Sequence, residues 1–306
     1  MPYKTREELL SAFKGLALRY PRLVTYERIG YSTQNREILC FKIGPHWGGK
    51  VLWQACIHGR EMINAEILWL YAKWLVEKKE PEAKRILTRN LTMIIPVLNI
   101  DNYNVTRKNA NGVDLNRNFE LGWCCGSRDP ARWDYKGPAT LSEKESQAFH
   151  SFVMRQRPVF FMDMHTGMPY ILFKVSASAY GKPAEYGTRI SKALALYKQI
   201  AGDRGQNPNE YIIKSLGPCG RAVCCSVNHG SHAFLWEFHP IERTIPNGPP
   251  YEEVEPVWFP KFLPMGIALS QACEVKPPTL QIMGLLSASG FLFLVALRND
   301  LKKQRL

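Results

Sequence analysis

The sequence lacks the patterns that mark several protein classes. None of its eight cysteines forms a CxxC pair, which excludes a structural zinc ribbon. Internal repeats and low-complexity segments are absent as well. Lys and Arg number 40 against 27 for Asp and Glu, a balance that favours anionic substrates. No basic stripe is interleaved with aromatic residues, however, so we expect no nucleic-acid partner.

What is present is an ordinary globular composition. The chain has 306 residues, 45% hydrophobic and 22% charged, enough for one large domain with a full core. Its cysteines include the adjacent pairs Cys124-Cys125 and Cys224-Cys225. The two pairs either meet in disulfides or remain reduced, partly buried thiols, and the sequence leaves both open.

The two ends of the chain differ. The first ten residues carry no apolar run of the secretory-signal kind. Residues 280–297 are uncharged throughout, and the basic tail 298–306 follows them. Such a run predicts a transmembrane helix that anchors the protein, with a buried C-terminal helix and a soluble protein as the alternative. We expect 276–279 to be a linker and 1–275 to be a single catalytic domain.

Within that domain, helical and strand patterns alternate, which predicts an α/β fold. Apolar residues recur at helical spacing near the start of the chain, and short apolar runs bounded by turns follow. We expect helices at 6–19, 64–79, 142–155, 182–201 and 259–273, and strands from 24 onward, notably at 37–43, 50–57, 91–98, 159–164 and 232–238.

A candidate metal site lies where two of these strands end. His58 and Glu61 directly follow the run VLWQACI, and their spacing turns both side chains to one side of a helical turn. His165 ends the run VFFMDM, so it belongs to the same edge of the sheet. Two histidines and a glutamate form a typical catalytic zinc set. Alternatively, His165 is a structural, hydrogen-bonded residue, and Asp163 either supports it or points elsewhere.

Two arginines between these ligands indicate an anionic substrate. Arg107 stands in TRKN, and Asn116 and Arg117 stand in GVDLNRNF. Guanidinium groups beside a metal ion are costly unless they meet an anion, and Arg binds carboxylates as a planar fork. Zinc at one end and an Asn/Arg clamp at the other predict an exopeptidase whose substrate is a peptide with a free C-terminal carboxylate.

A single carboxylate interrupts the apolar strand FLWEF. Burying Glu237 there is costly without a partner, so it is either ion-paired or functional. Beside a water activated by zinc, it would take the proton and pass it to the leaving amine.

Together these motifs, with YKGP at 135–138, resemble the carboxypeptidase A/B family of zinc peptidases over roughly residues 5–273. The resemblance implies a single α/β domain with a mixed, mostly parallel twisted sheet flanked by helices. It implies one zinc ion per chain and a role for each of the residues already named: His58, Glu61 and His165 as ligands, Arg107 polarising the scissile carbonyl, Asn116 and Arg117 holding the terminal carboxylate, and Glu237 as general base and acid.

Two features depart from that family. Tyr211 is the candidate for its substrate-capping tyrosine, in imperfect register, and the specificity loop reads GPCGRAVCC over 217–225. Arg221 in that loop either favours an acidic terminal side chain or lies on the surface. Two other functions stay open: a zinc amidohydrolase acting on acyl-amino acids or cell-wall peptides, and a non-catalytic, membrane-attached carboxylate-binding module.

Overall fold

The computed structural model describes residues 3–120, 123, 125–167, 170–174, 183–215, 221–240 and 249–274. The chain divides into two compact units, Met1–Glu274 and Val275–Leu306, and every described residue belongs to the first. The predicted linker 276–279, apolar segment 280–297 and basic tail 298–306 lie outside the described residues. Within the described ranges, no helix is long and apolar enough to cross a bilayer.

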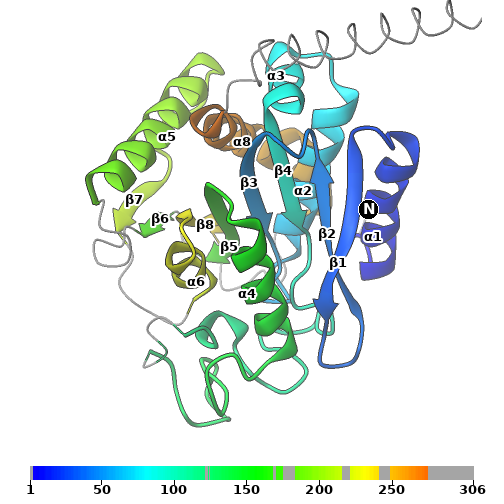
Figure 1. Cartoon of the computed structure of the whole chain (residues 1–306), viewed down its shortest axis with the longest axis vertical. Coiled ribbons are helices and arrows are strands. Elements are labelled where there is room, and N and C mark those ends of the chain that lie inside the picture. The colour runs from blue at the N-terminus through cyan, green and yellow to red at the C-terminus, as the bar shows by residue number, and fades with distance from the viewer. Residues whose placement is uncertain are drawn as a thin grey trace, which may run out of the picture. The chain divides into compact units, whose positions relative to one another are not determined.

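An eight-stranded mixed sheet organises the first unit (Figure 1). Its order is β1-β2-β4-β3-β5-β8-β6-β7. The four central strands are parallel to one another, β1 and β2 run antiparallel on one side, and on the other side β6 runs antiparallel to β8 and parallel to β7. The strands are β1 Val24–Tyr31, β2 Glu37–Ile43, β3 Gly49–Gln54, β4 Asn90–Ile95, β5 Phe160–Gly167, β6 Tyr170–Lys174, β7 Ile212–Ser215 and β8 His232–Pro240.

Helices flank this sheet, as predicted. In Figure 1, α4 and α6 lie in front of the sheet, whereas α2 and α8 lie behind it. The helices are α1 Arg6–Arg19, α2 Met62–Glu77, α3 Pro81–Arg89, α4 Lys144–Gln156, α5 Pro183–Asp203, α6 Ala222–Asn228, α7 Tyr251–Glu253 and α8 Phe259–Cys273, with short turns η1 Leu115–Arg117 and η2 Val254–Trp258. The mixed, mostly parallel α/β architecture is therefore confirmed.

The parallel strands determine where functional side chains meet. Strands β3, β5 and β8 lie next to one another and run in the same direction, so their carboxyl ends share one edge of the sheet. The register pairs His165 of β5 with Glu237 of β8. An irregularity in the pairing follows directly after His165. Two of the predicted site residues are thus held side by side by backbone pairing alone.

Candidate metal centre

The loop between β3 and α2 carries the first two candidate ligands. It is tightly packed: a Cβ at Gly59 would lie 2.0 Å from the carbonyl oxygen of Asn102, so only glycine fits there. Cys56 adopts a φ of 49°, a left-handed conformation that non-glycine residues rarely take. Glu61 precedes the first residue of α2, yet its side chain does not cap the helix. Instead, Oε1 of Glu61 lies 2.8 Å from Nδ1 of His58.

His165 completes a compact group with these two residues. Its Nδ1 lies 3.2 Å from Nδ1 of His58 and 3.2 Å from Oε2 of Glu61. All three side chains are buried, at 2–3% exposure, and their ligand atoms lie within 4.8 Å of one another. The structure therefore brings together the three residues that the sequence predicted as ligands.

Carboxylates stand behind both imidazoles. Oδ2 of Asp163 lies 2.9 Å from Nε2 of His165, and Oδ1 of Asp114 lies 3.3 Å from Nε2 of His58. A proton on Nε2 of His58 leaves its Nδ1 lone pair facing the centre, which is the arrangement of a metal-binding histidine. Nε2 of His165 is approached by Oδ2 of Asp163 at 2.9 Å and by Nδ2 of Asn116 at 3.1 Å, and a proton directed to the carboxylate leaves Nδ1 of His165 unprotonated as well. Asp163 therefore faces the metal group. Asp114 was quoted in the sequence motif without a role, although an acid next to the predicted clamp was a usable signal.

Electrostatics keep the central carboxylate ionised. Burial alone raises the pKa of Glu61, but the two neighbouring imidazoles outweigh it and hold that pKa well below its ordinary value. Burial likewise raises the pKa of Asp114, and His58 and Arg107 bring it well below normal. Two imidazole nitrogens and an ionised carboxylate are the donors of a three-ligand zinc site, so these residues fit that metal.

Glu237 lies beside this group on β8. Gly167 leaves space for it, because a Cβ at residue 167 would lie 2.9 Å from Oε2 of Glu237. Burial raises the pKa of Glu237, and the positive charges of the imidazoles offset this only in part. A carboxylate with a raised pKa next to a metal group is suited to accept and return a proton.

Arg107 and Asn116 both contact the metal group. Arg107 donates from Nε and Nη2 to Oδ2 of Asp114, at 3.0 and 2.8 Å, and its Nη1 lies 3.2 Å from Nδ1 of His58. Asn116 is buried, with Nδ2 3.1 Å from Nε2 of His165. Its Oδ1 accepts from the backbone N–H of Ala222 at 3.1 Å. The amide of Asn116 thus joins the β5 side of the site to the start of α6.

An exposed tryptophan, which sequence reasoning missed, lies under two of the predicted arginines. The Cζ atoms of Arg107 and Arg117 lie 5.0 and 5.8 Å from the ring centroid of Trp133, within the range of cation–π attraction. Arg117 also donates from Nη1 to the carbonyl of Asn116 at 2.8 Å. No motif around Trp133 indicated this contact.

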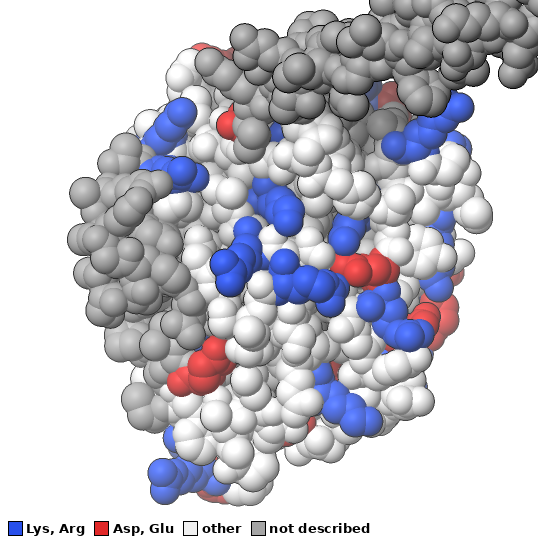
Figure 2. All heavy atoms as spheres, in the orientation of Figure 1, with Lys and Arg blue, Asp and Glu red and all other residues white. Residues whose placement is uncertain are grey.

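A basic cavity of about 250 Å³ opens beside Arg107. Its lining consists of Arg60, Thr106, Arg107, Lys108 and Trp133, three of which carry a positive charge. Elsewhere Lys and Arg are dispersed: Figure 2 shows more basic than acidic side chains on the face drawn, spread among uncharged ones. The cavity therefore brings three positive charges together beside Arg107.

The remaining two predicted residues behave differently. Tyr211 is buried, packs against Trp236 and Phe238, and donates its hydroxyl to the carbonyl of Phe238 at 2.8 Å. In this position it belongs to the core, and its substrate-capping role stays a prediction. Arg221 is half-buried at the start of α6, and its charge lowers the pKa of Glu237. Its buried Nε has no hydrogen-bond partner among the described residues.

Comparison with known proteins identifies one family. The family described as "Zinc carboxypeptidase" matches residues 9–235. Human carboxypeptidase O is 29% identical over 221 residues, which cover 63% of this chain and 59% of that protein. The chain thus matches less than two thirds of that relative's length.

Solved structures share the fold. The carboxypeptidase A structure from Helicoverpa armigera superposes with a TM-score of 0.72 at 19% identity, covering 89% of this chain and 74% of that one. Bovine thrombin-activatable fibrinolysis inhibitor, in complex with tick carboxypeptidase inhibitor, gives 0.71 at 21% identity, with 88% and 97% covered.

Proposed function

Because the chain belongs to the zinc carboxypeptidase family, we propose that it is a zinc-dependent carboxypeptidase that hydrolyses the C-terminal peptide bond of its substrate. The observation that carries the proposal is the convergence of His58, Glu61 and His165, with Glu237 paired beside His165 on the neighbouring strand. A metal set and a separate carboxylate at one sheet edge suit metal-assisted hydrolysis.

The three ligands would hold one zinc ion per chain. When bound, it supplies a Lewis acid that polarises a carbonyl and lowers the pKa of a water. Asp114 and Asp163 lie next to Nε2 of His58 and His165, and their carboxylates favour the tautomers in which the metal-facing nitrogens are unprotonated.

Glu237 acts as the general base and then the general acid. Its carboxylate accepts the proton of the attacking water and returns it to the leaving amine. The raised pKa that burial gives this carboxyl brings its two protonation states closer in free energy near neutral pH. Arg107 has Nη1 on the metal side while Asp114 holds Nε and Nη2. We assign Nη1 to the carbonyl oxygen, where negative charge develops.

The substrate's terminal residue lies between Arg117 and Arg221. Asn116 and Arg117 bind its carboxylate, with the guanidinium positioned over Trp133. Arg221, whose Nε lacks a partner in the described part of the chain, pairs with an acidic terminal side chain. A peptide ending in Asp or Glu is the favoured substrate class.

The Arg117→Ala variant tests the exopeptidase assignment. Losing a charge-assisted contact worth about 1.5–3 kcal/mol should lower kcat/KM for free-carboxylate peptides about 10- to 100-fold. C-terminally amidated peptides lack the anion, so their slower turnover should not change. The matched control is Arg128→Ala, because Arg128 is an exposed arginine nearby in the chain. Equal losses on both peptide types would contradict the assignment.

Terminal preference is tested separately. We expect Arg221→Gln to lower the ratio of kcat/KM for peptides ending in Glu to that for peptides ending in Leu by about tenfold, because the half-buried Arg221 loses its charge pair with the terminal Glu side chain. An unchanged ratio would place Arg221 outside the pocket. Zinc-loaded protein that cleaves acyl-amino acids but no peptide would instead support the amidohydrolase alternative.

A further inference from the structure

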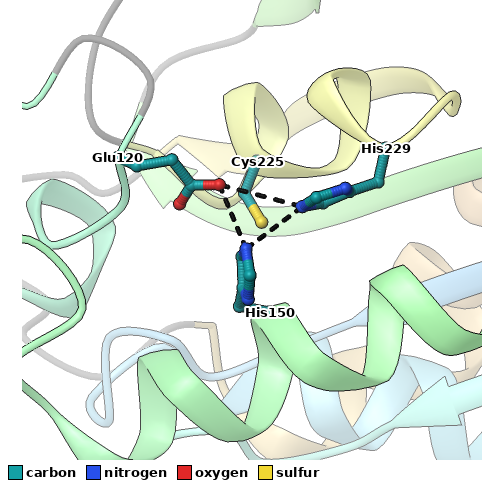
Figure 3. Close-up of side chains that lie close together, drawn as sticks. All are labelled: Glu120, His150, Cys225 and His229. Atoms are coloured by element: carbon teal, nitrogen blue, oxygen red, sulfur yellow. Dashed lines mark hydrogen bonds and ion pairs between the residues drawn. The ribbon is translucent and has the colours of Figure 1, made fainter.

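We propose that Glu120, His150, Cys225 and His229 bind a second zinc ion, in a site separate from the candidate catalytic centre. Their potential ligand atoms all lie within 4.8 Å of one another. Figure 3 shows the four side chains pointing toward a common point. This group shares no residue with the first centre and, unlike it, contains a sulfur atom.

Three segments of the chain bring these side chains together. Cys225 lies on α6, and His229 follows that helix four residues later, a spacing that places both on one side of a helix. His150 comes from α4, which packs against α6. Glu120 follows η1 in the chain. Helix α6 and its C-terminal end thus carry Cys225 and His229, and the packing of α4 on α6 brings His150 next to them.

The separations suit a tetrahedral metal site. Nε2 of His150 lies 3.1 Å from Nε2 of His229 and 3.2 Å from Oε1 of Glu120, and Nε2 of His229 lies 3.8 Å from the same oxygen. Zinc bonds of about 2.0–2.3 Å at tetrahedral angles place ligand atoms roughly 3.3–3.8 Å apart. Small side-chain movements would therefore seat the ion.

The donor atoms of the cluster are placed for a metal. Nε2 of His150 and Nε2 of His229 lie 3.1 Å apart, and each presents a lone pair to a metal when its ring proton is on Nδ1. Oε1 of Glu120 is the carboxylate oxygen that faces both imidazoles, so it is the atom placed to bind a metal. Burial and the nearby His150 lower the pKa of His229, and Glu120 opposes this shift.

Zinc is the metal that this donor set prefers. A thiol with two imidazoles and a carboxylate suits Zn²⁺ better than Mg²⁺ or Ca²⁺, which take oxygen ligands. Burial raises the pKa of Cys225, so the thiol is protonated without metal. On binding, the thiol proton leaves to solvent and the sulfur–metal bond forms. Four protein ligands leave no position for water, which is the pattern of a structural site.

The second site lies next to segments of the chain that carry candidate substrate-binding residues. Glu120 is three residues beyond Arg117, and the N–H of Ala222 at the start of α6 donates to Oδ1 of Asn116. A metal held by Glu120 and α6 would therefore connect the two segments that carry Asn116, Arg117 and Arg221. It would brace the wall of the candidate substrate pocket.

Cobalt substitution tests the proposal on the full chain. Metal-free protein titrated with Co²⁺ should develop a thiolate-to-cobalt charge-transfer band because Cys225 is a ligand, and the band should be complete at two equivalents in the wild type and at one equivalent in His165→Ala, which retains only the second site. His165→Ala should keep the band and Cys225→Ala should lose it. Cys273→Ala, the matched control at another buried thiol, should keep it. A band that persists in Cys225→Ala, or no band in the wild type, would overturn the proposal.

Zinc counting provides the second readout. We expect two zinc ions per wild-type chain and one in each of His165→Ala, Cys225→Ala and Glu120→Gln, the last being nearly isosteric and safe for folding. A wild-type stoichiometry of one, or two in Glu120→Gln and Cys225→Ala alike, would overturn the site. Neither readout requires turnover, so the second site and the proposed peptidase activity can fail independently.

Discussion

Replacing Asp163 by Asn should weaken zinc binding at the catalytic centre without contacting the metal. Asp163 is fully buried: Oδ1 accepts from Nε2 of Gln54 at 2.9 Å, and Oδ2 lies within ion-pair distance of Nε2 of His165, at 2.9 Å. Asparagine has one oxygen for these two donors. If that oxygen stays with Gln54, the new NH₂ group faces His165 and favours the tautomer with its proton on Nδ1, which blocks the ligand lone pair.

The magnitude follows from the loss of this supporting carboxylate. Removing such a partner costs about 10- to 100-fold in metal affinity, or about 1.4–2.7 kcal/mol. The donor left without an acceptor in Asp163→Asn should also lower the free energy of unfolding of the zinc-free protein by about 1–3 kcal/mol. The assay is competition for zinc with a chelator, in a Cys225→Ala background so that a single centre is read.

The matched control is Asp101→Asn. Asp101 is also buried and accepts from Ser32, Gln34 and Arg36, but it lies away from the metal group. It should lose stability to urea by a similar amount and keep its zinc affinity. Zinc affinity that is unchanged in Asp163→Asn, or reduced equally in both variants, would refute the reasoning.

Further predictions address positioning and pH. Gly167→Ala should lower kcat about tenfold with zinc content intact, because its Cβ would displace the carboxylate of Glu237; unchanged kcat would show that the carboxylate tolerates the shift. Trp133→Leu should raise KM several-fold and lower kcat by a smaller factor, since Arg117 and Arg107 each lose a cation–π partner of about 0.5–1 kcal/mol and Arg107 is assigned to the carbonyl oxygen; an unchanged KM would contradict this. Stability to urea should fall as pH rises above about 9, because burial raises the pKa of Cys273 to about 12 and the unfolded chain then binds fewer protons; a flat profile from pH 8 to 10 would contradict it.

The central strands and long helices were predictable because their apolar pattern is strong. The helices at 6–19 and 259–273 and the strand at 37–43 match α1, α8 and β2 in their bounds. The helices α3, α6 and α7, the strands β6 and β7, and the short elements η1 and η2 were missed. Both strands have at most five residues, too short for a period-2 pattern to stand out, and their pairing with β8 and each other decides their conformation.

The metal-binding residues could be predicted from local sequence, since each follows an apolar strand. Contacts that depend on tertiary packing could not be predicted. Asp114 reaches His58 from 56 positions away, and no local pattern shows that contact. Tyr211, the capping candidate in imperfect register, packs against Trp236 and donates its hydroxyl to the carbonyl of Phe238, and no local pattern shows either contact. Likewise, only the spacing of Cys225 and His229 within the second cluster is visible in the sequence.

The central claim is that Glu237 performs the chemistry while His58, Glu61 and His165 hold the metal. The most direct measurement compares wild type with Glu237→Gln for zinc content and for hydrolysis of N-blocked dipeptides. We expect the zinc content of Glu237→Gln to equal that of the wild type and its turnover to fall on the order of 10²–10⁴-fold. Turnover that survives the substitution with zinc bound would contradict it.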